Sequence, residues 1–102
     1  MKVSVFVPSD PEKAIVAEIP PAACSLSAKV RECITDEMQP FQDDCDIEFV
    51  ERADPRRISL HPTRPISDER RQKMARELVS ALSLYWELGT KAEVTNEQRV
   101  AA

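Results

Sequence analysis

The chain has 102 residues, 42% of them hydrophobic and 31% charged, which is enough for one folded domain and too little for two. One glycine against eight prolines excludes the glycine-rich loops that hold nucleotides, because those loops need glycine where the backbone approaches a phosphate. No apolar run approaches the roughly 20 residues that cross a membrane, and no secretory signal is apparent, so we expect a cytoplasmic protein without membrane contact.

The net charge of −4 is unevenly distributed along the chain. Residues 1–51 contain four basic and eleven acidic residues, whereas residues 52–76 contain eight basic and three acidic ones. This segregation indicates either two faces for different partners or acids and bases that neutralise each other in the folded sheet.

Two strands are expected at the N-terminal end. Residues 2–7 place three valines on one face in strict alternation, which is typical of a half-buried strand. After a turn that contains two prolines, residues 14–19 can pair back as a second strand, with Val5 opposite Ile15. The consecutive prolines at positions 20 and 21 end that strand because neither can donate a ladder hydrogen bond.

A first helix is predicted over residues 25–38, with Ser25 as its N-cap and its end before Pro40. One stripe of this helix is apolar and is expected to face the sheet. It consists of Leu26, Val30, Cys33, Ile34 and Met38.

Residues 45–51 and 56–61 predict two strands joined by a four-residue hairpin loop. Opposed residues share a face, so keeping the apolar side chains together fixes the register. The expected pairs are Phe49 with Ile58, Ile47 with Leu60, Glu48 with Ser59, Asp46 with His61 and Glu51 with Arg56.

The last helix is predicted over residues 68–88, with Ser67 as N-cap and Gly89 as C-cap. Apolar side chains in its second half cover an arc of about 220°, far more than one sheet needs to bury. The first helix, a second copy of the chain docked through this helix, or a partner protein would cover the excess. The candidate apolar contacts are Val79, Leu84, Trp86 and Leu88.

We therefore predict a single α+β domain over residues 1–89, followed by a polar, flexible tail over residues 90–102. It has two layers: a small, mainly antiparallel sheet with two helices on one face, in the order ββαββα or βαββα. The predicted core contains Val3, Val5, Val7, Leu26, Val30, Ile34, Ile47, Phe49, Ile58, Leu60, Met74, Leu78, Leu82 and Tyr85.

The sequence predicts no catalytic residue, no metal and no cofactor. The odd number of cysteines (Cys24, Cys33 and Cys45) indicates free thiols in a reducing compartment. No spacing pre-arranges them with His61 as zinc ligands. His61 is the only histidine, and nothing in the spacing selects a nucleophile for it to activate.

Binding to another protein is the function that these patterns favour. An acidic stretch from residue 36 to residue 51 would steer the chain toward a basic surface, such as that of a nucleic-acid-handling protein, as an inhibitor or modulator. The acidic candidates are Asp43, Asp44, Asp46 and Glu48.

Two alternatives stay open. The first is direct nucleic-acid binding by the basic segment 52–76. Its candidates are Arg56, Arg57, Arg64, Arg70, Arg71, Lys73 and Arg76. The second is a small enzyme whose site forms in a dimer cleft near His61.

The order of strand, helix, strand hairpin and long capped helix resembles the small DinI-like proteins, which are DNA-damage-inducible modulators of the RecA recombinase filament. Residues 1–7, 26–34, 46–49, 58–60 and 67–86 carry the resemblance. It implies that acids on the last helix dock on the recombinase in place of DNA. This chain has acids there but adds four bases and inserts residues between Val7 and Leu26. The acids are Asp68, Glu69, Glu77 and Glu87, and the bases are Arg70, Arg71, Lys73 and Arg76.

Overall fold

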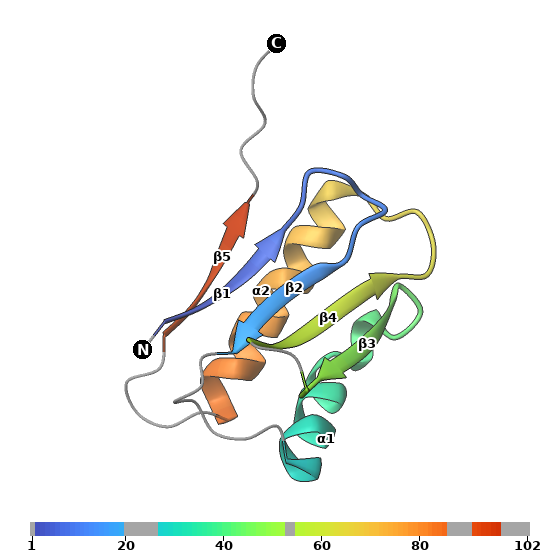
Figure 1. Cartoon of the computed structure of the whole chain (residues 1–102). Helices are drawn as coiled ribbons and strands as arrows, with labels where there is room; N and C mark the ends of the chain where they lie inside the picture. Colours follow the sequence, from blue (N-terminus) through green and yellow to red (C-terminus); the bar gives the residue numbers. More distant parts are fainter. Residues whose placement is uncertain (1, 20–26, 53–54, 86–90, 97–102) are drawn as a thin grey trace.

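The computed structural model shows a two-layer α+β fold, as the sequence predicts (Figure 1). It describes residues 2–19, 27–52, 55–85 and 91–96. In these residues the elements run in the order β1 (Lys2–Val7), β2 (Ile15–Ile19), α1 (Ala28–Glu37), the 3-10 helix η1 (Gln39–Phe41), β3 (Cys45–Val50), β4 (Arg56–Pro62), α2 (Asp68–Tyr85) and β5 (Lys91–Asn96).

The five strands form one sheet in the order β3-β4-β2-β1-β5. All neighbours are antiparallel except β1 and β5, which are parallel. The predicted β3–β4 register is confirmed for four pairs, from Asp46 opposite His61 to Phe49 opposite Ile58, whereas the expected pair of Glu51 with Arg56 lies beyond the end of β3 at Val50. The β1–β2 register differs by two residues, because Val5 lies opposite Ala17. The expected pairing of Val5 with Ile15 would require Lys13 to lie opposite Val7 as part of the second strand. The Lys13 N–H instead donates to the Asp10 carbonyl at 3.1 Å, so Lys13 belongs to the turn and β2 begins later.

Strand β5 corrects the expectation that everything after residue 89 is a polar tail. Residues 91–96 pair with β1, placing Val94 beside Val5. Of the described β5 side chains only Val94 is partly buried, whereas Glu93, Thr95 and Asn96 are exposed. This strand is defined by its backbone hydrogen bonds to β1. Such bonds leave no hydrophobic pattern in the sequence, so the pattern did not predict the strand.

The two helices begin at serine caps. The Ser67 hydroxyl accepts a hydrogen bond from the Arg70 N–H at 3.2 Å, as predicted for α2. For α1 the cap is Ser27, whose hydroxyl accepts from the Val30 N–H at 3.4 Å, instead of the predicted Ser25. Ser25 and Gly89 lie outside the described residues.

The core lies between the helices and one face of the sheet, and both helices pack on that side (Figure 1). Nine predicted core residues are buried: Val3, Val5, Val7, Ile34, Ile58, Leu60, Met74, Leu78 and Leu82. Three more are half-buried against them: Val30, Ile47 and Phe49. Leu26 and the side chain of Tyr85 are outside the described part of the chain.

The opposite face of the sheet carries no helix in the described structure. Its side chains come from the alternate positions of each strand, so they are the ones that the core does not use. Phe6 lies there, 39% exposed, with Val16 as its register partner.

Candidate functional site

Asp44 is the first predicted site residue that the structure places differently. It is only 3% exposed, so it is not a surface acid. Its Oδ1 accepts hydrogen bonds from Nε and Nη2 of Arg64 at 2.9 and 2.6 Å. Its Oδ2 accepts from Nε of Arg70 at 3.0 Å. The prediction that Asp44 binds a partner is therefore wrong, because two guanidinium groups of the same chain already occupy its carboxylate.

These contacts also determine the charge state of Asp44. The hydrogen bonds from Arg64, and after them those from Arg70, lower the pKa of the carboxyl group below 3.8, whereas burial alone would raise it. The Arg70 guanidinium also donates to the Pro40 carbonyl at 3.0 Å and lies 4.4 Å from the centroid of the Phe41 ring. Asp44 therefore stays ionised and ties α2 to the turn before β3.

Arg71 is a second charged group committed to the interior. It is 2% exposed, and its Nη2 donates to the Pro8 and Asp10 carbonyls at 2.9 and 3.2 Å. Its Nη1 lies 3.5 Å from Oδ1 of Asp68. Arg71 thus holds the β1–β2 connection against the start of α2 instead of facing a ligand.

The basic candidates consequently do not form one patch. Arg64, Arg70 and Arg71 make the internal contacts described above. Arg57 projects from β4 on the helix-free face, at the position opposite Val50. The two remaining exposed bases, Lys73 and Arg76, lie on α2, in the other layer, and Arg56 is half-buried.

The three other acidic candidates lie within one short segment of the chain, residues 43–48. Asp43 is in the turn directly before β3, and Asp46 and Glu48 are alternate residues of β3 on the helix-free face. All three are exposed. Oε1 of Glu48 lies 3.1 Å from Nε2 of His61, which is also exposed. In the described part of the chain, no lysine or arginine pairs with any of the three.

These acids follow an edge of the sheet, because among the described strands β3 has a neighbour only on its β4 side. The Thr63 N–H donates to the Asp44 carbonyl at 3.0 Å and so continues the β3–β4 ladder. In an antiparallel pair, residues whose N–H and C=O groups bond the partner strand alternate with residues whose groups point away from it. Because Asp44 bonds Thr63, the even-numbered β3 residues turn their backbone groups toward β4. Pro62, which has no N–H, lies opposite Cys45 and fits this pattern. Ile47 and Phe49 therefore direct their N–H and C=O groups outward.

A pocket of about 230 Å³ lies beside this edge. Asp46 points to one face of the sheet and Cys45 and Ile47 to the other, so a pocket lined by all three lies alongside the outer edge of β3. The other lining residues come from the end of α1, η1 and the following turn: Thr35, Met38, Gln39, Phe41 and Gln42.

Four of the eight residues that line this edge pocket are apolar. Met38, Phe41 and Cys45 are buried, and Ile47 is half-buried. Burial, and then the charges of Asp44 and Asp46, raise the pKa of Cys45 to about 11, so its thiol is neutral near pH 7. Its Sγ donates to the Phe41 carbonyl at 3.7 Å. The sequence pattern alone does not predict this pocket, although the end of the helix before Pro40 and the odd-numbered apolar residues of β3 together mark it.

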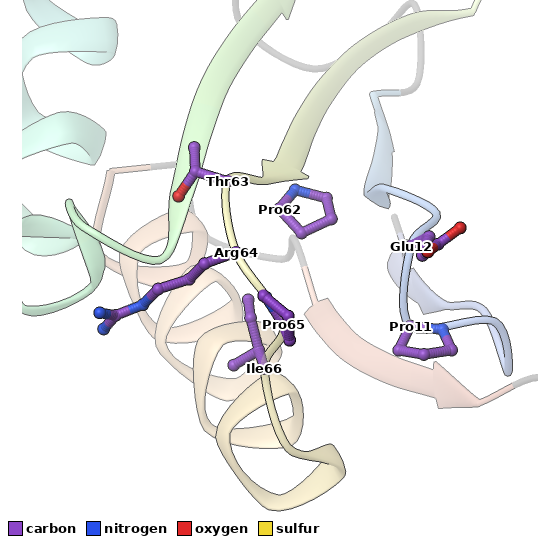
Figure 2. A pocket seen from close by; sticks show the side chains of 7 residues that line it. All are labelled: Pro11, Glu12, Pro62, Thr63, Arg64, Pro65 and Ile66. Atoms are coloured by element: carbon purple, nitrogen blue, oxygen red, sulfur yellow. The ribbon is translucent and has the colours of Figure 1, made fainter.

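A larger pocket of about 390 Å³ lies between the β1–β2 turn and the β4–α2 connection (Figure 2). Figure 2 shows Pro11 and Glu12 on one side and residues 62–66 on the other. The Arg64 guanidinium points away from Pro11 and Glu12, consistent with its bonds to Asp44. The wall is thus mainly proline rings and Ile66, with few polar groups that could orient a ligand.

The apolar arc predicted on the last helix can be placed only in part. Val79 is half-buried and packs against the core, so it belongs to the domain itself. The side chain of Leu84, together with Trp86 and Leu88, lies outside the described residues.

Two further findings concern the described residues alone. They contain no group of three His, Cys, Asp or Glu side chains arranged to hold a metal ion. Their helices include none with the length and apolar character that crossing a membrane requires.

Comparison of the chain with protein-family models, with curated proteins and with solved structures finds no match. The resemblance to DinI-like proteins therefore stays a prediction.

Proposed function

We propose that this chain is a small non-catalytic regulatory protein that binds a basic surface of another protein through the acidic edge strand β3. The observation that carries the proposal is the grouping of Asp43, Asp46 and Glu48, three exposed carboxylates without a lysine or arginine partner in the described chain. Exposed carboxylates attract a basic surface and accelerate association with it.

The distribution of the basic residues favours a protein partner over a nucleic acid. Phosphates would be repelled by the β3 acids, and Arg64, Arg70 and Arg71 already bind groups of their own chain. Proteins that handle nucleic acids present lysine- and arginine-rich surfaces. An acidic protein that occupies such a surface inhibits or modulates the nucleic-acid-handling protein to which the surface belongs.

The resemblance to DinI-like proteins supports a partner of this class, since those proteins modulate a recombinase. The docking element differs from what the resemblance implies. In this proposal the acids belong to β3, whereas the last helix contributes Arg70 and Arg71 to internal contacts. We place the protein in the cytoplasm, where the free thiols of Cys33 and Cys45 stay reduced.

The test compares two triple variants of equal charge. One neutralises the β3 acids (Asp43→Asn, Asp46→Asn, Glu48→Gln), and the control neutralises three exposed acids elsewhere (Glu12→Gln, Glu18→Gln, Glu69→Gln). The immobilised proteins are incubated with native lysate, and retained proteins are quantified by mass spectrometry. We expect a basic protein that the wild type and the control retain, that about 0.5 M salt releases, and that the β3 variant retains about tenfold less.

Circular dichroism melting establishes that both triple variants are folded. Equal retention by the wild type and the β3 variant would contradict the proposal. Equal loss in both triple variants would also contradict it, because only the net charge of the chain would then matter.

A further inference from the structure

We propose that β3 takes up an extended basic peptide as an additional strand of the sheet, with one apolar side chain of that peptide in the edge pocket. The inference rests on the proposed function and specifies which part of the partner is bound: a segment in which lysine or arginine alternates with apolar residues. Peptides that add to an exposed sheet edge obtain affinity from main-chain hydrogen bonds and specificity from pockets for alternate side chains.

The backbone of β3 supplies the hydrogen bonds. Asp46 and Glu48 lie opposite His61 and Ser59 and use their backbone groups toward β4. Ile47 and Phe49 turn theirs outward, where the described sheet has no further strand. A peptide in extended conformation matches this spacing of two donors and two acceptors.

The side chains on both sides of this edge specify the chemistry of the peptide. On the helix-free face, an added strand places its side chains next to Asp46 and Glu48, which favours lysine or arginine. On the other face it places them next to the edge pocket, where Met38, Phe41 and Ile47 offer an aliphatic side chain apolar contacts beside the polar lining residues. Successive residues of the peptide alternate between the faces, so the two preferences produce a basic–apolar alternation.

Charge also argues against a second copy of the chain at this edge. Two β3 strands paired antiparallel about Glu48 would bring acids of both copies into direct opposition, which is destabilising. Charged side chains on an edge strand are a known protection against such self-pairing. Just after the C-terminal end of β3, Nη2 of Arg31 lies 2.5 Å from Oε2 of Glu51 and neutralises it. The β3 acids available to a peptide are therefore Asp46 and Glu48.

The probe is a synthetic ten-residue peptide with lysine at every second position and leucine or threonine between the lysines. Its matched control has the same sequence and charge, but the backbone nitrogens on the edge that would face β3 are methylated. Affinity is measured by fluorescence anisotropy, and amide hydrogen exchange is measured by NMR on the full chain. We expect exchange at Ile47 and Phe49 to slow about tenfold, and methylation to weaken binding about tenfold.

Two variants of the protein separate the backbone from the pocket. Ile47→Pro removes an outward N–H and leaves the ladder to β4 intact, a position at which edge strands accept proline. Ile47→Ala keeps the N–H and reduces only the pocket wall. We expect the proline variant to bind the lysine peptide more weakly than the alanine variant does. If the proline variant does not fold, the methylated peptide still makes the backbone comparison.

Equal affinities for the parent and methylated peptides overturn strand addition, as do unchanged exchange rates at Ile47 and Phe49. The proposed function survives that result if the β3 triple variant still loses its retained protein. The proposed function and strand addition are both overturned if the β3 triple variant binds the lysine peptide and retains the basic protein as strongly as the wild type does. Protection of Ile47 and Phe49 in a peptide-free dimer would assign the edge to a second copy and overturn the inference.

Discussion

Asp44 shows how one side chain can reverse the interpretation of a charge pattern. In the sequence it is one of several acids between residues 36 and 51, with no feature that sets it apart. In the structure it bridges Arg64 and Arg70, which follow it by 20 and 26 residues. Separations of that size carry no periodic signal, so only the folded chain reveals the partner. The neighbouring Asp43, of the same type, stays exposed and available.

Replacing Asp44 by asparagine is expected to destabilise the fold by about 2–3 kcal/mol, because the amide cannot satisfy both guanidinium groups and the buried site keeps its cost of desolvation. The free energy of unfolding is measured by urea denaturation at pH 7. Asp43→Asn, one residue away on the surface, is the matched control and should change it by less than about 0.5 kcal/mol. Equal effects of the two substitutions would refute a special role for Asp44.

At the scale of single elements, the features with local signals were predicted well. The β3–β4 hairpin has the expected register because apolar and polar residues alternate on both strands. The α2 helix begins where Ser67 caps it. The prediction of the β1–β2 register was wrong because the turn after Pro8 uses more residues than expected. Strand β5 was not predicted because Val94 is the only one of its described side chains that is partly buried.

The cap of α2 provides a test at this scale. Ser67→Ala removes the hydroxyl that accepts from the Arg70 N–H, and we expect the free energy of unfolding to fall by about 1 kcal/mol. Ser67→Gly should lose only a few tenths of that amount, since glycine is an acceptable cap residue. Thermal melts followed by circular dichroism measure both. A glycine variant less stable than the alanine variant would contradict the assignment of Ser67 as the cap.

At the scale of the whole molecule, the acidic and basic segments of the sequence meet at one buried point, Asp44. Asp44 of the acidic first half pairs with Arg64 and Arg70 of the basic segment, whereas Glu51 pairs at the surface with Arg31 of its own half. Asp43, Asp46 and Glu48 stay exposed beside this buried pair, and they form the candidate site. The sequence could locate the acidic stretch, but it could not indicate which acids would be neutralised, because that depends on the packing of α2 against the turn before β3.

This pairing predicts a pH dependence of stability. The pKa of Asp44 is lower in the folded chain than its ordinary value, so ionised Asp44 stabilises the fold fully above about pH 4. That contribution disappears as the pH falls through the lowered pKa. We therefore expect the difference in free energy of unfolding between the wild type and Asp44→Asn to be constant from about pH 7 to 5 and to shrink below about pH 4. Urea titrations across this range measure it, and a difference independent of pH would exclude the mechanism.

The parallel pairing of β1 with β5 has a consequence for the order of assembly. A nascent chain on the ribosome exposes β1 early, yet β1 reaches its outer neighbour only after residue 96 has been made. Until then the valine-rich first strand is an open border of the growing sheet. Contacts between segments so distant in sequence slow folding. A chaperone or a competing chain therefore has its best opportunity at β1 during synthesis, before the last strand closes that side.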